Sequence, residues 1–212
     1  MLFVAALSTL LASAALTSAT PVSLAKRNET VQGPTPDLAN VMTFTPPTPP
    51  TLDWLYRAYV LCPLDLLDGE VGPLGQRKAI PIIGGNVTLN DGTVGYLRNL
   101  GADEGLVDAQ TGLFTADTRY HAVLPVANGY NGTGASNETD LFFQTSGPKQ
   151  ADGSLHLRIK IETSSKPYYH FNNLVVNGVL NNLGRDENGT STLRIDAYHM
   201  SGEWTNTTFL TD

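Results

Sequence analysis

From about residue 52 onward the chain is a series of short apolar segments separated by Gly, Asn and Asp. The alternation is clearest in residues 154–163 (SLHLRIKIET), where the leucines and isoleucines share one face and His156 and the charged side chains share the other. Turn sequences such as Asn90-Asp91-Gly92 lie between segments, and no segment has a sustained helical period. We therefore predict strands over residues 53–62, 78–83, 85–90, 93–99, 104–108, 112–125, 140–146, 154–163, 171–180 and 191–200.

These strands predict an all-β fold, either a sandwich or a barrel. The chain has one cysteine, Cys62, so it cannot form an intrachain disulfide, and its core must hold the fold together. A closed antiparallel β-barrel of the lipocalin type, with about 8–10 strands, leaves no exposed edge and suits such a chain. Cys62 lies in an apolar segment, which favours a buried inert thiol over a nucleophile.

The stretch LGQRKAIPIIGGNVT (residues 74–88) places a glycine pair after an apolar run. Glycine pairs of this kind can cradle phosphates where a helix N-terminus follows. Here the following residues alternate like a strand. Gly84-Gly85 is therefore predicted to be a bulge or a sharp corner of the barrel. Val87 and Leu89 are expected to face inward, opposite Asn86.

The N-terminal segment is apolar and ends in small residues, which is typical of a secretory signal peptide over residues 1–19, with a membrane anchor as the alternative. Residues 20–50 contain the dibasic pair Lys26-Arg27 and a Pro/Thr-rich run. They are predicted to be a propeptide and linker, although the dibasic pair is equally consistent with a plain solvated surface. Residues 51–212 then form the β-barrel domain.

Glycosylation sequons support a secreted or secretory-pathway location, because oligosaccharide transfer takes place in that compartment. Each used sequon must lie on the surface, and after signal removal no membrane association is expected. The six candidate asparagines are Asn28, Asn86, Asn131, Asn137, Asn188 and Asn206.

Composition and charge exclude several classes of function. The chain has 212 residues, a formal net charge of −7 and no basic cluster, which argues against a nucleic-acid partner. It lacks the G-x-S-x-G elbow, H-E-x-x-H, the Walker loop and C-x-x-C, and its four histidines are widely spaced. No metal site is predicted.

Five sequence motifs occur in an order that resembles the DUF3237 (UPF0311-like) family: GQRKAIPIIGG, GYLRNLGADE, DAQTGLFTADTRYHAVL, KPYYHFNNLVVNGV and LRIDAYHM. The resemblance covers roughly residues 52–200. It implies a closed antiparallel barrel with an internal cavity. A secreted fungal branch of the family includes hetero-Diels–Alderases of tropolone sesquiterpenoid biosynthesis.

That branch implies a cofactor-free reaction in secondary metabolism, in which a tropolone quinone methide adds to a humulene-type sesquiterpene. An apolar cavity that holds two apolar small-molecule substrates together supplies effective molarity. A donor near the tropolone oxygen and a general acid for water loss would assist the reaction. A lipocalin-like binding protein for an apolar small molecule is the alternative, and a secreted structural or effector barrel with a filled interior is a third candidate. A closed barrel has no surface pattern that indicates an oligomeric state.

The motifs supply candidate site residues. Arg77, Asp103 and Arg119 match family positions and are candidates for a polar cluster at the cavity, with an Arg–Asp pair that locks a turn as the alternative. His170 is a candidate acid, and otherwise a surface histidine. The predicted substrate-binding residues, for which core packing or a turn role is the alternative, are Trp54, Tyr56, Tyr120, Tyr169, Asn173 and Tyr198.

Overall fold

The computed structural model describes residues 48–63, 67–126 and 137–202. The predictions for residues 1–19 and for most of 20–50 lie outside these ranges. Ten strands and one short helix follow one another along the described chain. They are β1 (Leu52–Cys62), β2 (Leu67–Gly72), β3 (Gly75–Pro81), β4 (Gly84–Leu89), β5 (Val94–Asp108), β6 (Phe114–Pro125), β7 (Glu138–Pro148), β8 (Leu155–Glu162), η2 (Lys166–Asn173), β9 (Val176–Arg185) and β10 (Ser191–Met200).

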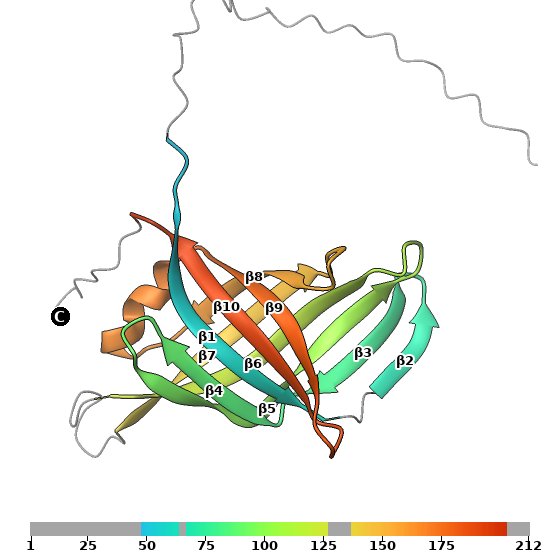
Figure 1. Ribbon diagram of the computed structural model, residues 1–212, viewed down its shortest axis with the longest axis horizontal. Coiled ribbons are helices and arrows are strands. Elements are labelled where there is room, and N and C mark those ends of the chain that lie inside the picture. Colours follow the sequence, from blue (N-terminus) through green and yellow to red (C-terminus); the bar gives the residue numbers. More distant parts are fainter. Residues whose placement is uncertain (1–47, 64–66, 127–136, 203–212) are drawn as a thin grey trace, which may run out of the picture. The chain divides into compact units, whose positions relative to one another are not determined.

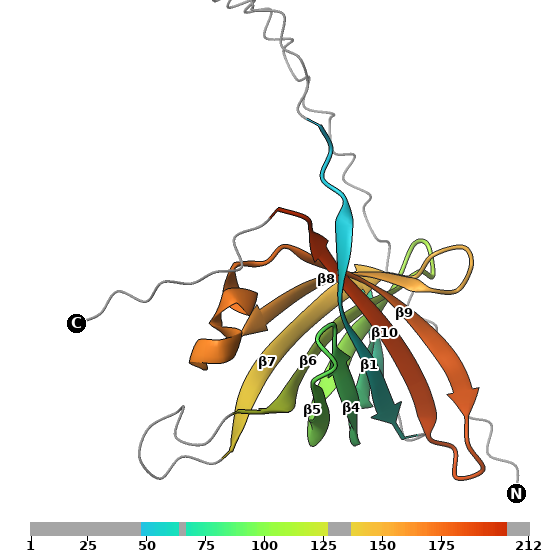
Figure 2. The same cartoon turned by 60° about the vertical axis from the view of Figure 1, so that its left-hand side comes forward.

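The strands form a closed antiparallel barrel, as predicted. The sheet order is β2-β3-β5-β4-β1-β10-β9-β8-β7-β6, and a further pairing of β5 with β6 closes the ring. Eight strands make up this ring, and β2 and β3 extend the sheet beyond it. Figure 2 shows the strands following one another round the barrel, and Figure 1 shows β2 and β3 at the end away from the helix η2.

Alternation along the strands builds the core. In β8 every second residue, from Leu155 to Ile161, is buried, and the residues between them are exposed. The buried side chains of the barrel strands meet inside the ring as one hydrophobic cluster. This arrangement is the consequence of the period of two, because one face of a closed sheet has only the interior to occupy.

The Gly84-Gly85 pair is the predicted corner. Strand β3 ends at Pro81 and β4 begins at Gly84, and both glycines have positive φ. A Cβ on Gly85 would lie 2.0 Å from the carbonyl oxygen of Tyr59 on β1, so only glycine allows this approach. Val87 and Leu89 point inward, at 1% and 3% exposure, and Asn86 is exposed.

Strand β5 joins two of the predicted strands, 93–99 and 104–108, into one element of 15 residues. Its first part pairs with β4 and its second part with β3, and a register shift lies between Leu97 and Gly101 on the β6 side. Strand β2 was not predicted. All six of its residues are exposed, so it has no buried face from which a pattern could arise.

The prediction of a strand over residues 171–180 is wrong for its first part. Residues Lys166–Asn173 form a 3-10 helix with a proline in its first turn, and β9 begins only at Val176. The side chain of Asn172 fixes this helix, because its amide accepts a hydrogen bond from the Thr163 N–H and donates to the Thr163 carbonyl. Phe171 is buried in the core.

No helix among the described residues is long and apolar enough to cross a membrane.

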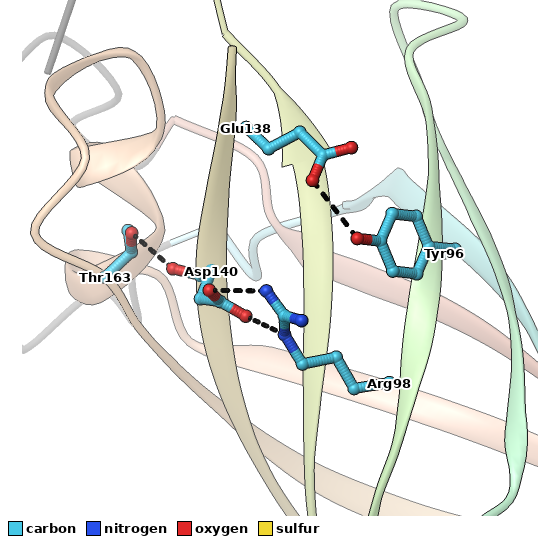
Figure 3. Close-up of polar contacts among 5 residues, drawn as sticks. All are labelled: Tyr96, Arg98, Glu138, Asp140 and Thr163. Atoms are coloured by element: carbon cyan, nitrogen blue, oxygen red, sulfur yellow. Dashed lines mark hydrogen bonds and ion pairs between the residues drawn. The ribbon is translucent and has the colours of Figure 1, made fainter. Parts of the chain in front are cut away.

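Two polar contacts connect β5 to β7 across the outer face of β6 (Figure 3). Arg98 donates two hydrogen bonds to the Asp140 carboxylate, at 2.5 and 3.0 Å, and the Tyr96 hydroxyl donates to Glu138 at 3.1 Å. Val123 lies opposite both Tyr96 and Asp140 in the ladder, and only 1% of it is exposed. These contacts therefore cover an apolar side chain on the outside of the barrel.

Candidate functional site

An enclosed space lies inside the barrel, and residues of β1, β3, β5 and β6 form part of its wall. Its volume is about 40 Å³, which holds a few water molecules rather than a terpenoid. The internal cavity that the family resemblance implies is therefore small, because the barrel's own side chains fill most of the interior. The lining residues are Val60, Cys62, Ile80, Ile82, Asp103, Thr118, Tyr120, Thr145, Leu180, Leu193 and Ile195.

Among the ionisable groups that line this space, Asp103 is the one suited to proton transfer near neutral pH. Its ladder neighbours are Ile80 on β3 and Thr118 on β6. The carboxylate accepts a hydrogen bond of 2.8 Å from the Asp117 N–H and another from the Thr118 hydroxyl. Burial nevertheless dominates and raises the pKa of Asp103 to about 6. A carboxyl with this pKa can both donate and accept a proton near neutral pH.

Cys62 lies in the same space and is 4% exposed. Burial, and secondarily the charge of Asp103, raise the pKa of the Cys62 thiol to about 11. The thiol is therefore protonated at neutral pH and is a poor nucleophile. This agrees with the prediction of a buried inert thiol.

Two predicted substrate-binding tyrosines lie deep in the barrel. Tyr120 lines the space and stacks on Phe143 with ring centroids 5.1 Å apart, and Tyr56 meets the same ring edge-on at 5.6 Å. Burial raises the pKa of both tyrosines. The interaction between the two hydroxyls adds to the rise for Tyr56 and opposes it for Tyr120. Neither hydroxyl makes a hydrogen bond of ordinary geometry with a described residue. Tyr120 and Asp103 line the same space.

The predicted arginine cluster is not formed. Arg77 is exposed and donates a hydrogen bond of 2.9 Å to the Glu104 carbonyl, and Arg119 pairs with Asp117 at 3.1 Å on the outer surface. Neighbouring residues of a strand point to opposite faces, so Arg119 cannot share the interior with Tyr120. Arg119 and Asp117 both belong to β6, so their pair is not the turn-locking Arg–Asp pair stated as the alternative.

The predicted residues of the YYHFNN segment lie on η2, away from Asp103, which is on β5. His170 contacts Phe171 edge-on, with centroids 4.5 Å apart. Burial lowers the pKa of His170, and the nearby His199 adds to this effect, so the ring is neutral at neutral pH. Tyr169 and Asn173 are exposed. None of these three residues is among the described residues that line the enclosed space.

Trp54 and Tyr198 lie on the outer face of the barrel. They are opposite each other in the ladder between β1 and β10, and Trp54 is 37% exposed. Tyr198 lines a groove on that face rather than the interior.

Three of the six sequon asparagines are described, namely Asn86, Asn137 and Asn188, and all three are exposed, as glycosylation requires. Asn28, Asn131 and Asn206 lie outside the described residues. Glycosylation itself stays a prediction.

Thr118 and Thr145 are the polar lining residues that the sequence reasoning did not single out. Thr118 lies two residues before Tyr120 and therefore shares its face. This spacing of two residues from Tyr120 could have identified Thr118 from the sequence. Thr145 has no comparable signal, because its contact with the space depends on how the ring closes.

Comparison with known proteins supports the fold. No family model matches the chain, and no curated protein matches it. A β-barrel-like protein from Acinetobacter baumannii superposes with a TM-score of 0.58 at 25% identity, over 74% of this chain and 100% of that one.

A conserved protein of unknown function from Rhodopseudomonas palustris superposes with a TM-score of 0.54 at 19% identity, over 72% of this chain and 99% of that one. An enzyme from Penicillium herquei has a TM-score of 0.53 at 18% identity, over 74% and 99%. The barrel thus resembles that of a fungal enzyme and those of uncharacterised proteins.

Proposed function

We propose that the chain is a cofactor-free enzyme that uses Asp103 as an acid–base group, and that its reaction is the hetero-Diels–Alder addition implied by the sequence resemblance. The observation that carries the proposal is a carboxyl with a pKa of about 6 on the wall of an otherwise largely apolar enclosed space. Perturbed carboxyls of this kind are typical of acid–base sites.

The chemistry needs two proton transfers, one from Asp103 to the leaving hydroxyl and one from the ring hydroxyl back to Asp103. Protonated Asp103 donates its proton to the hydroxyl of a hydroxymethyl tropolone as the carbon–oxygen bond breaks and water leaves. The resulting carboxylate takes the proton of the ring hydroxyl, which leaves a neutral quinone methide. The alkene of a humulene-type terpene then adds across the quinone methide. Tyr120 lines the same space, and in this proposal its hydroxyl donates a hydrogen bond to the ring oxygen.

Access is the main structural requirement, because the closed space is far smaller than the two reactants. Strand β3 pairs with β2 and β5, and β1 pairs with β4 and β10. Across the β1–β3 junction, the described backbone has the hydrogen bond from the Ile83 N–H to the Leu61 carbonyl, 2.9 Å long, but no strand pairing. Val60, Cys62, Ile80 and Ile82 lie on the two sides of this junction and line the space. Opening at this junction would expose Asp103 to a substrate.

The test is turnover of a hydroxymethyl tropolone with a humulene-type alcohol, measured as adduct yield and diastereomer ratio against a protein-free control. Asp103→Asn is expected to lower the rate by about a hundredfold or more. Glu104→Gln is the matched control, because Glu104 is the next residue and is exposed on the opposite face. The wild-type rate is expected to fall as pH rises above about 6, since the acid form is consumed.

A yield and a diastereomer ratio equal to those of the control would refute the enzyme. In that case the small enclosed volume favours a barrel filled by its own core, unless saturable binding of the terpene identifies a binding protein. Equal losses in Asp103→Asn and Glu104→Gln would refute the role of Asp103 alone.

A further inference from the structure

A groove on the described barrel surface lies outside the ring, not within it. It crosses β8, β9 and β10, has a volume of about 530 Å³ and is lined mainly by apolar atoms. Leu52 and Val179 contribute apolar side chains, and Arg158, Asn177 and Tyr198 contribute polar groups. A volume of this size is typical of small-molecule sites, which range from about 300 to 1,000 Å³.

Strand register explains how the polar groups come together. Arg158 is opposite Asn177, and Asn177 is opposite Tyr198, so the three side chains form one row across three strands on the outer face. Val179 lies two residues beyond Asn177 on the same face of β9, which places an apolar side chain beside the row. The groove therefore has a polar side and an apolar side.

The charge of the groove is positive in a chain whose net charge is −7. Arg158 is exposed, and no ion pair or hydrogen bond joins its side chain to another described residue. Asp196, opposite Val179 in the ladder, pairs with Arg57 at 2.6 Å and with Arg194 at 3.0 Å, so two cations compensate its charge.

Asp117 lines a neighbouring depression together with Arg158, but it pairs with Arg119 at 3.1 Å. Asp152 interacts with His156 of the groove and with the N–H and hydroxyl of Ser154. Among the described residues, no acidic side chain lines the groove. An unpaired guanidinium at an apolar groove favours a ligand that brings its own negative charge.

We propose that this groove binds an amphiphilic organic anion, with its apolar body against Leu52, Val179 and Tyr198 and its single anionic headgroup on Arg158. The site is on the opposite face of the sheet from Asp103 and does not depend on the function proposed above. Asn177 lies between Arg158 and Tyr198, where its amide can donate to the same headgroup.

The test compares octanoate with 1-octanol, two probes that share an apolar chain and differ in charge, by titration calorimetry on the full chain. Octanoate is expected to bind more tightly than 1-octanol. Arg158→Gln is expected to weaken octanoate by about tenfold while leaving 1-octanol within about twofold. Lys160→Gln is the matched control, since Lys160 is two residues away on the same exposed face but does not line the groove and already pairs with Glu162.

Equal affinity for the two probes would overturn the assignment of an anionic ligand. Equal weakening by Arg158→Gln and Lys160→Gln would overturn the role of the groove, because it would indicate general surface charge. Absence of octanoate binding to a wild-type chain that unfolds cooperatively would overturn the whole proposal. Asp103→Asn separates the two proposals, because it is expected to bind octanoate as the wild type does even where turnover is lost.

Discussion

Replacing Asp103 with asparagine is expected to stabilise the fold at neutral pH. The carboxyl is largely buried, and burial raises its pKa from 3.8 to about 6 despite hydrogen bonds from the Asp117 N–H and the Thr118 hydroxyl. Ionising Asp103 therefore works against folding. An asparagine has nearly the same shape, keeps an oxygen for the Asp117 N–H, and carries no charge at any pH.

The pKa gives the magnitude and the sign. A rise of about 2.2 in pKa, at about 1.36 kcal/mol per unit, corresponds to about 3 kcal/mol. The folded state holds this proton more tightly than the unfolded state, so the stability it contributes is fully present below pH 3.8 and is lost as pH rises through about 6. Asp103→Asn is thus expected to exceed the wild type by up to about 3 kcal/mol at neutral pH, and by little near pH 4.

Urea denaturation of both proteins at about pH 4 and about pH 7.5 measures this difference. Asp140→Asn is a control of opposite sign, because the hydrogen bond from Arg98 lowers the pKa of Asp140. Its loss should therefore destabilise the protein at the higher pH. The reasoning about Asp103 is wrong if Asp103→Asn is the less stable protein at about pH 7.5, or if its difference from the wild type is the same at both pH values.

Two further predictions concern close packing and the thiol. Gly147→Ala is expected to destabilise the fold by about 1–3 kcal/mol or more, since the added Cβ would lie 1.8 Å from the His156 carbonyl oxygen and force β7 and β8 apart. Urea denaturation tests this against Gly72→Ala, whose Cβ meets nothing nearer than 3.8 Å; equal losses would contradict it. Cys62 is expected to react with iodoacetamide at about pH 8 about a hundredfold more slowly in the folded than in the unfolded chain, because its pKa is about 11 and its thiol is buried. Mass spectrometry over time measures this rate, and equal rates would show that the thiol is accessible.

The sequence predicts the barrel wherever one face of a strand is buried. The alternation of β8 is readable because its leucines and isoleucines have no place except the interior. Strand β2 has no such face and is held by its pairing with β3, so no pattern indicates it. The helix η2 is misread as a strand at residues 171–173, because a short 3-10 helix fixed by the side chain of Asn172 leaves no helical period.

The candidate site is predictable only in part, for a reason of the same kind. Parity along β6 separates Tyr120, which is inside, from Arg119, which is outside, and this was available from the sequence. The environment of Asp103 could not be predicted from the sequence. Its pKa depends on Leu180, Leu193 and other side chains of distant strands, which the closure of the ring brings to the same space.

The pKa of Asp103 and the opening of the β1–β3 junction are thermodynamically coupled. If opening hydrates the carboxyl, its pKa returns toward 3.8, and above about pH 6 the closed state is disfavoured relative to the open state by up to the same 3 kcal/mol that ionisation takes from folding. Below that pH the protonated carboxyl favours closure. In the described backbone no strand pairing joins β1 to β3 at the junction, so little backbone hydrogen bonding between these strands opposes this effect. A buried acid at this position therefore acts on access as well as on chemistry: the same protonation that makes Asp103 a proton donor also closes the space around it.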